Sequence, residues 1–271
     1  LMEMKAARMY GVRDIRIENI PVPKIGEGDI LLKVRAASVC GTDIRMYQNG
    51  YGGIDQKNPR ILGHEIAGEI VEVGQKVNDY KIGQRITVAP NMWCGLCDRC
   101  IEGNSHLCPD YKALGIQIDG GFAEYCLIPD AAVKSGNVFV LKDSISFEEA
   151  AGNEPLSCAF NGSERCEIRP GDTVLIIGAG PIGLMHAKLA KMAGAGRVFL
   201  NDLNQDRLSV VKKVDCDIIT IEGDPKEEVF KQTKDGVDVC IIACPSPAAQ
   251  SMAPGLCTYN ARVLFFGGVP Q

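Results

Sequence analysis

The chain has 271 residues, enough for one large or two medium-sized domains with hydrophobic cores. Its 29 Lys and Arg residues against 34 Asp and Glu residues give a formal net charge of −5; without basic runs, this balance argues against nucleic acid as a partner. No apolar stretch is long enough to span a membrane, and the first residues carry charges where a signal peptide has an apolar core. We therefore expect a cytoplasmic protein with neither membrane nor nucleic acid among its partners.

The first half of the chain is predicted to be β-rich. Short apolar or alternating runs at residues 30–36, 66–73 and 85–88 predict strands, and Gly and Pro residues separate them. Such a series is typical of a barrel or sandwich with irregular loops. Met4 and Met9, together with Met2, indicate packing of an N-terminal strand.

A cluster of cysteines follows on a polar loop: Cys94, Cys97, Cys100 and Cys108. Two-residue gaps let neighbouring thiolates converge on one tetrahedral Zn²⁺, with each sulfur about 2.3 Å from the metal. The alternative is a disulfide knot or a set of packing cysteines. The long chain, the lack of a signal peptide and the other cysteines scattered through apolar segments favour zinc. Four thiolates fill the coordination sphere, so this site predicts a structural metal without chemistry of its own.

The pattern changes near residue 148, where apolar strands begin to alternate with helices. This alternation predicts a parallel sheet covered by helices on both faces. We place the boundary at Gly152, which predicts domains of residues 1–152 and 153–271. Helices are predicted over 148–158 and 181–193, and strands over 173–177, 197–202, 217–220, 237–243 and 262–266.

The turn after strand 173–177 carries a G-x-G-x-x-G fingerprint. Gly178 permits the tight turn, Gly180 lets the backbone approach a pyrophosphate, and Gly183 allows close contact between helix and strand. The helix that follows offers free N–H groups and its positive dipole end to the phosphates. Asp202, nineteen residues after Gly183, would accept hydrogen bonds from the adenosine ribose and repel a 2′-phosphate, which favours NAD over NADP. The alternative, a glycine turn in a flavodoxin-like sheet without a cofactor, does not account for the complete fingerprint.

Three other segments carry residue types that bind zinc, namely Cys40, His64 and Glu154. A thiolate, an imidazole and a carboxylate can form a three-ligand site with an open fourth position, which is the catalytic arrangement. Each residue also has a simpler explanation: a buried cysteine, a hydrogen-bonded core histidine, or an acid at a helix N-terminus. Spacing alone does not decide between these interpretations.

The motifs taken together resemble the zinc-dependent medium-chain alcohol dehydrogenase family. Gly63-His64-Glu65-x₂-Gly68-x₅-Gly74-x₂-Val77 is similar to the zinc signature of that family, and the Cys40-Gly41-Thr42-Asp43 element, the cysteine cluster and the glycine turn occur in the same order. The resemblance covers essentially the whole chain. It implies an α/β protein in which a GroES-like β-rich catalytic domain is joined to a Rossmann domain with a doubly wound parallel sheet. Glu154-Pro155-Leu156-Ser157 resembles the polyol (sorbitol) and threonine dehydrogenase branch.

This resemblance also implies roles for single residues. Cys40 and His64 would be ligands of a catalytic zinc, while Glu65 and Glu154 would bind the metal directly, through water, or alternately. Zinc would lower the pKa of the substrate hydroxyl, Thr42 would relay its proton, and hydride would pass to nicotinamide. Thr42 and Glu65 are thus the implied catalytic residues, and two zinc ions per chain and NAD the implied cofactors. Further implied NAD contacts are Pro181, Ile182, Arg207, Gly267, Gly268 and Val269.

Two features depart from the family pattern. Many relatives have a histidine where this chain has Arg45. Arginine stays protonated and cannot act as a base, so the proton must leave through water or another group. Three interpretations of Arg45 stay open: it meets an anionic substrate such as a sugar phosphate, it contacts a cofactor phosphate, or it is a solvated charge. The second departure is the sheet. Five strands are predicted where a complete Rossmann sheet has six, so we expect it to be truncated after the fifth strand, with the rest beyond Gln271.

The sequence thus predicts an oxidoreductase that transfers hydride from a secondary alcohol, a polyol or a polyol phosphate, to NAD⁺. The main alternative is an amino-alcohol dehydrogenase of the L-threonine 3-dehydrogenase type. A non-catalytic zinc- and nucleotide-binding relative is disfavoured because Cys40, Thr42, His64 and Glu65 are all present, and a zinc-free quinone reductase for the same reason. The family resemblance further implies a homo-oligomer, either a dimer or a tetramer.

Overall fold

The computed structural model describes residues 2–269. It forms two compact units, the first of which ends at Glu154 while the second begins at Pro155. Within the described residues, no helix combines the length and apolar character needed to cross a membrane.

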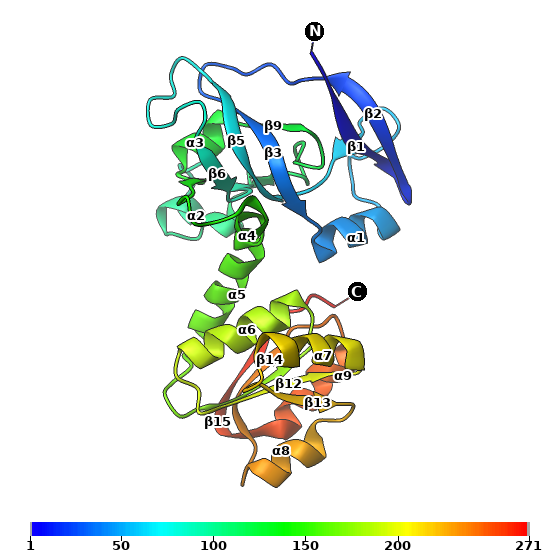
Figure 1. Cartoon of the computed structure of the whole chain (residues 1–271), viewed down its shortest axis with the longest axis vertical. Coiled ribbons are helices and arrows are strands. Elements are labelled where there is room, and N and C mark those ends of the chain that lie inside the picture. The colour runs from blue at the N-terminus through cyan, green and yellow to red at the C-terminus, as the bar shows by residue number, and fades with distance from the viewer. Residues whose placement is uncertain (1, 270–271) are drawn as a thin grey trace. The chain divides into compact units, whose positions relative to one another are not determined.

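Antiparallel strands build the first unit (Figure 1). Its larger sheet has the strand order β10-β6-β5-β3-β9, its smaller sheet the order β2-β1-β4, and β7 pairs with β8. The strands are β1 (Glu3–Gly11), β2 (Asp14–Pro21), β3 (Ile30–Ser38), β4 (Arg60–Ile61), β5 (Glu65–Val73), β6 (Arg85–Val88), β7 (Asn91–Met92), β8 (Lys112–Ala113), β9 (Tyr125–Ile128) and β10 (Val138–Val140). The helices are α1 (Gly41–Asn49), α2 (Asp98–Ile101), the 3₁₀ helix η1 (Ser105–Leu107), α3 (Asp130–Lys134) and α4 (Phe147–Ala151).

The core of the larger sheet comes from the runs that predicted its strands. Ile30 and Leu32 of β3, Ile66 and Ile70 of β5 and Ile86 of β6 are fully buried in one cluster. Alternate residues of a strand share a face, so each run supplies one apolar side to the core. The predicted β-rich architecture of the first unit and its three strands are therefore confirmed.

The N-terminal strand β1 is also present, with Met4 and Met9 buried as the sequence indicated. Met2 is exposed instead. The hairpin partner β2 was not predicted, because only one of its sides meets the protein and its residues Asp14–Pro21 are mostly charged or exposed. The position of β2 is set by its pairing with β1 and not by an apolar pattern in its sequence.

The second unit contains a five-stranded parallel sheet with the order β13-β12-β11-β14-β15. Ile176 of β11 packs with Ala187 and Leu208 on one face of the sheet, whereas Leu175 packs with Val229 on the other. Because neighbouring strand residues point to opposite faces, the continuous apolar strand requires helices on both sides. The doubly wound Rossmann sheet is confirmed. Its elements are β11 (Thr173–Ile177), β12 (Arg197–Asp202), β13 (Ile219–Glu222), β14 (Val237–Ile242), β15 (Cys257–Phe265), α6 (Pro181–Met192), α7 (Gln205–Val214), α8 (Lys226–Gln232), α9 (Pro247–Met252) and the 3₁₀ helix η2 (Ala253–Leu256).

Two predicted elements differ from the structure. The helix predicted over 148–158 is two helices, α4 and α5 (Asn153–Arg165), which meet at Gly152. Pro155 has no N–H and cannot continue the hydrogen-bond ladder of α4, so a new helix starts around it. Strand β15 begins at Cys257, five residues before the predicted start, and its pairing with β14 is irregular there. Asn260 in that stretch has φ +61, a conformation that interrupts the regular strand pattern used for prediction.

Candidate functional site

A thiol, an imidazole and a carboxylate from two separate segments converge in the first unit. Cys40 is the N-cap of α1, His64 precedes β5, and Glu65 is the first residue of β5. Their ligand atoms all lie within 4.8 Å of one another, and the side chains of His64 and Glu65 are buried. The mixed S, N and O donor set suits Zn²⁺, and three protein ligands leave one coordination position for another molecule. The residues therefore fit the catalytic zinc that the family resemblance implies here.

Glu154 is not one of these converging ligands, although it belongs to the same compact unit. Its negative charge nevertheless acts on His64. Burial lowers the pKa of His64, but the hydrogen bond to Cys40 and the charges of Asp43, Cys40 and Glu154 outweigh burial and raise that pKa to about 9. A pocket that favours a proton on imidazole this strongly is electrically negative, and the same groups favour a bound cation.

Asp43, which the sequence did not single out as a site residue, joins two of the ligand segments. It is 4% exposed; one carboxylate oxygen accepts the Cys40 N–H at 2.9 Å and the other accepts the Gly63 N–H at 3.3 Å. The second oxygen also lies 3.7 Å from His64 Nδ1, a buried atom that has no hydrogen-bond partner in the part of the chain that the structure describes. A carboxylate facing Nδ1 leaves Nε2 as the ring nitrogen for a metal. Burial raises the pKa of Asp43, and the backbone N–H bonds partly oppose that rise.

Glu65 is held by a serine on the neighbouring strand. Ser38 ends β3 and pairs directly with Glu65 at the start of β5. The Ser38 hydroxyl donates a hydrogen bond to Glu65 Oε2. Because both residues sit in a hydrogen-bonded sheet, the carboxylate has a defined direction instead of a free rotamer. A lone serine at a strand end carries no sequence signal of such a role.

Glycines bring a distant loop against the histidine segment. Gly63 has φ +91, which favours glycine, and its carbonyl accepts the Gly121 N–H at 2.8 Å. A Cβ on Gly120 would lie 2.1 Å from the Gly63 carbonyl oxygen. No side chain fits there, so this loop packs backbone against backbone next to His64.

Thr42, the predicted proton relay, is in the first turn of α1. Its Oγ1 accepts a hydrogen bond from Arg45 Nη2 at 2.9 Å. A hydroxyl has one hydrogen to donate as well as lone pairs to accept with. With Arg45 supplying a donor, the Thr42 hydrogen is left for another acceptor.

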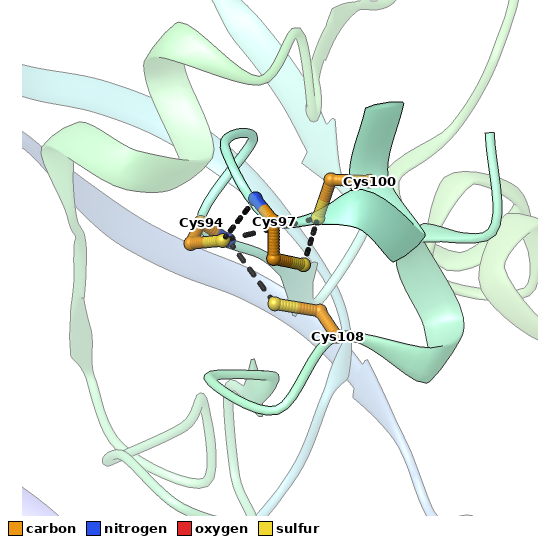
Figure 2. A group of neighbouring side chains, drawn as sticks. All are labelled: Cys94, Cys97, Cys100 and Cys108. Carbon is orange, nitrogen blue, oxygen red and sulfur yellow. Dashed lines mark hydrogen bonds between the residues drawn. The ribbon is translucent and has the colours of Figure 1, made fainter. Parts of the chain in front are cut away.

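The four clustered cysteines form a second metal-type group (Figure 2). The Cys97 and Cys100 sulfurs are 3.5 Å apart and those of Cys94 and Cys100 4.0 Å. Four thiolates at about 2.3 Å from one zinc ion place their sulfurs about 3.8 Å apart, so the spacing fits a closed tetrahedral site. All twelve cysteines are free in the structure, which contradicts the alternative of a disulfide knot.

Backbone N–H groups donate hydrogen bonds to sulfurs of this cluster, an arrangement that stabilises thiolates. The N–H groups of Leu96 and Cys97 point to Cys94 Sγ at 3.5 and 3.4 Å, and the N–H of Cys94 points to Cys108 Sγ at 3.4 Å. The hydrogen bonds from Leu96 and Cys97 lower the pKa of Cys94 to about 7. A cysteine binds a metal as the thiolate, and these hydrogen-bond donors stabilise that form.

In the second unit, the turn between β11 and α6 has the geometry of a dinucleotide cradle. Gly178 has φ +111, and a Cβ on Gly183 would lie 1.7 Å from the Gly178 carbonyl oxygen. Gly180 is the N-cap of α6, and a Cβ there would meet nothing within 4 Å. The first and third glycines are thus required by the fold, while the second leaves open space at the helix N-terminus. Pro181 and Ile182 open the helix beside that space.

Asp202 lies at the carboxyl end of β12, next to this turn. Its carboxylate accepts the Ala179 N–H at 2.7 Å and the Asn204 N–H at 2.8 Å, while Arg207 Nη1 is 3.5 Å away. Burial alone would raise the pKa of Asp202, but the two backbone hydrogen bonds and Arg207 lower it overall. An ionised acid therefore marks this edge of the sheet.

Gly267 and Cys244 lie at the same carboxyl edge of the sheet. The Gly267 N–H bonds to Ile242 O at 2.9 Å, and a Cβ on Gly267 would lie 2.4 Å from the Cys244 carbonyl oxygen. A Cβ on Gly178 would meet Cys244 Cβ at 3.0 Å. Cys244 follows the parallel strand β14, and this position after a strand is the sequence signal that places it at this edge. Gly268 and Val269 follow Gly267 beyond β15.

Two family models match the chain. Residues 26–136 match the model described as alcohol dehydrogenase GroES-like domain, and residues 181–271 match the model described as zinc-binding dehydrogenase. The two matches fall on the two units that carry the candidate metal centres and the dinucleotide cradle, respectively.

Curated relatives and solved structures agree with these models. Sorbitol dehydrogenase from Bacillus subtilis is 42% identical over 255 residues, with 92% of this chain and 71% of the relative covered. L-Threonine 3-dehydrogenase from Symbiobacterium thermophilum is 36% identical, with 93% and 71% covered. The structure of a Sinorhizobium meliloti protein assigned as a zinc-binding dehydrogenase, with NADP bound, has a TM-score of 0.92 at 34% identity, with 100% of this chain and 78% of that chain covered.

Proposed function

Since the chain belongs to the zinc-dependent alcohol dehydrogenase family, we propose that it oxidises a secondary alcohol of the polyol class to a ketone with NAD⁺. The observation that carries this proposal is the convergence of Cys40, His64 and Glu65 within 4.8 Å of one another. A closed site such as the cysteine cluster would only stabilise a fold, whereas a three-ligand set leaves room for a substrate oxygen.

The first unit holds the proposed catalytic metal. Cys40, His64 and Glu65 are the ligands supported by their distances, and Glu154 contributes charge and is a further ligand candidate. Zinc, when bound, acts as a Lewis acid that lowers the pKa of an alcohol hydroxyl. Asp43 orients the His64 ring, and Ser38 orients Glu65.

Thr42 is the proposed first acceptor of the substrate proton. The hydrogen bond that it receives from Arg45 fixes its Oγ1, so its own hydrogen can be passed on as the substrate proton arrives. Arg45 cannot take that proton, and water at the exposed side of α1 receives it. Cys94, Cys97, Cys100 and Cys108 are proposed to bind a second, structural zinc ion.

The second unit is proposed to bind NAD through the glycine turn and Asp202. NAD⁺, when bound, accepts the hydride that leaves the carbinol carbon. Gly180 admits the pyrophosphate to the N-terminus of α6. Asp202 would hydrogen-bond the ribose hydroxyls and repel a 2′-phosphate, while Arg207 lies 3.5 Å from Asp202 and partly offsets its charge. We expect Asp202→Ser to reduce the preference of kcat/KM for NAD over NADP by at least about tenfold. An unchanged preference would remove Asp202 from this role.

The polyol class rests on the sorbitol dehydrogenase relative at 42% identity. A second candidate substrate is L-threonine, because a threonine dehydrogenase relative is 36% identical over a similar share of the chain. The deciding experiment is NAD⁺ reduction with sugar alcohols, their phosphates, L-threonine and simple alcohols. Turnover confined to L-threonine would contradict the polyol proposal.

Metal analysis separates an enzyme from a non-catalytic relative. We expect two zinc ions per chain, one in Cys40→Ser and one in Cys100→Ser, with activity lost only when the Cys40 site is empty. One zinc ion per wild-type chain, unaffected by Cys40→Ser, would contradict a catalytic centre. Mass spectrometry of the intact protein under native conditions gives the count for each variant.

We further propose that the protein acts in the cytoplasm as a homo-oligomer. Twelve free cysteines suit a reducing compartment, and the oligomer follows from family resemblance. Light scattering coupled to gel filtration measures the oligomeric state, and a monomer at micromolar concentration would contradict the second part of this proposal.

A further inference from the structure

We infer that the substrate carries an oxyanion, a phosphate or a carboxylate, close to its reacting carbinol carbon, and that Arg45 binds this group. The inference rests on the proposed function and narrows its substrate class. It is carried by the position of Arg45 and by two observations on the described residues: most hydrogen-bond donors of Arg45 have no partner there, and no acidic side chain pairs with it.

Arg45 lies one helical turn after Thr42, on the helix whose N-cap is the ligand candidate Cys40. Its Nη2 donates to Thr42 Oγ1 at 2.9 Å. A Cβ on Gly41 would lie 3.9 Å from Arg45 Nη1, so the guanidinium covers the first turn of α1. The charged group therefore sits beside the proposed proton relay and near Gly41, the residue that follows the ligand candidate Cys40.

Among the described residues, no acidic side chain neutralises the charge of Arg45. None of the ion pairs between described residues includes Arg45, whereas Arg35 and Arg99 pair with Glu69 and Glu102. A guanidinium has five N–H donors in a planar fork, and one of them bonds to Thr42. The remaining donors match the two oxygens of a carboxylate or phosphate.

The reach of Arg45 sets where the oxyanion must be. A hydroxyl that bonds a substrate oxygen does so at about 2.7 Å, and Arg45 Nη2 is 2.9 Å from the Thr42 oxygen. The guanidinium therefore lies within about 6 Å of the reacting oxygen. A phosphate or carboxylate attached one or two carbons from the carbinol carbon spans that distance. An uncharged polyol has no such group, so the remaining N–H donors of Arg45 would bond to water.

The test compares charged with uncharged substrates in matched variants. Initial rates at saturating NAD⁺ are measured for a polyol and its monophosphate, and for L-threonine and 2-butanol. Arg45→Gln removes the charge, Arg45→Lys keeps it without the fork, and Lys76→Gln removes an exposed surface charge in the loop after β5. Zinc content and thermal midpoint show whether each variant is folded and loaded.

We expect Arg45→Gln to lower kcat/KM for the oxyanion substrate about ten- to a hundredfold, as for a lost charge-assisted hydrogen bond. With the uncharged counterpart, Arg45→Gln should lower kcat/KM by less than about threefold. For the oxyanion substrate, kcat/KM of Arg45→Lys should lie between the values of wild type and Arg45→Gln, and Lys76→Gln should have the wild-type value. A larger loss of kcat/KM for the polyol monophosphate than for L-threonine identifies the group as a phosphate, and a larger loss for L-threonine identifies it as a carboxylate. Inorganic phosphate should compete with the uncharged polyol in wild type and lose this effect in Arg45→Gln.

Three outcomes would overturn the inference. Equal losses for charged and uncharged substrates would make Arg45 a positioning residue for Thr42 only. A loss confined to the KM for NAD⁺ and to NADH affinity would make it a cofactor contact, and no loss would make it a solvated charge. A wild-type protein that oxidises none of the substrates would instead contradict the proposed function itself.

Discussion

The buried histidine of the second unit gives a quantitative prediction about stability. His186, on α6, has no exposed surface; its Nδ1 lies 3.0 Å from Ser163 Oγ, and its ring meets that of Phe266 edge-on at 4.8 Å. Its Nε2 is buried and, within the described residues, has no hydrogen-bond partner. Burial in these surroundings lowers the pKa of His186 to about 4.

The sign of the pH effect follows from that depressed pKa. The unfolded chain takes up a proton on this histidine below about pH 6.5, while the folded unit stays neutral down to about pH 4. Protonation therefore stabilises the unfolded chain, and the stability due to His186 is complete above pH 6.5 and lost as the pH falls. The loss amounts to about 2 kcal/mol by pH 5 and about 3 kcal/mol by pH 4.

The perturbation is His186→Gln, whose side chain fills a similar space without titrating. Hydrogen exchange of the α6 amides, corrected for intrinsic rates, gives the opening free energy of the second unit at pH 8 and pH 5. Exchange suits this purpose because the single tryptophan, Trp93, belongs to the first unit and reports nothing local to α6. Amides of β5 in the first unit serve as an internal control.

We expect wild type to lose about 2 kcal/mol of opening free energy between pH 8 and pH 5, and His186→Gln to lose much less. The interval stops at pH 5 because most carboxyl groups titrate below it. Equal pH dependence in the two proteins would refute the assignment of the effect to His186.

Three further predictions follow from single contacts. Gly183→Ala places a Cβ 1.7 Å from the Gly178 carbonyl oxygen, so NADH affinity measured by fluorescence should fall at least about tenfold, whereas Gly52→Ala, which meets nothing within 4 Å, should bind as wild type. Asp43→Asn should lower the zinc affinity of the site formed by Cys40, His64 and Glu65 about 10- to 100-fold, measured in competition with a chelator. An unchanged zinc affinity would contradict the orienting role of Asp43. The two lysine partners of Asp215 lower its pKa to about 2, so its contribution is present above about pH 4 and is lost toward pH 2; Asp215→Asn should lower the urea midpoint at pH 6 and not at pH 2.

Local patterns predicted most of the fold. The apolar strands of both units and the glycine turn after β11 are read from neighbouring residues, because strand and turn geometry repeat over a few positions. The cysteine cluster is equally local: its gaps of a few residues bring the sulfurs to 3.5 and 4.0 Å from one another. The break between α4 and α5 at Gly152, by contrast, was not predicted, because it depends on the single missing N–H of Pro155.

The candidate catalytic site was predictable only in part. Cys40, His64 and Glu65 could be named from motifs, but their convergence depends on the register of β3 with β5 and on α1 beginning at Cys40. Asp43 and Ser38 were missed because a carboxylate or hydroxyl becomes an orienting group only when folding places its partners nearby. Figure 1 shows α1 and β5 as separate elements of the first unit.

The sequence by itself determined the two-part α/β architecture, the closed cysteine cluster and the dinucleotide turn, because each is encoded within a short stretch of chain. Only the tertiary structure decided that Asp43 ties the Cys40 and His64 segments together, that Ser38 holds Glu65, and that Arg45 bonds to Thr42 with no acidic partner among the described residues. Such contacts depend on distances and directions between side chains, and neither quantity is written in the order of the residues.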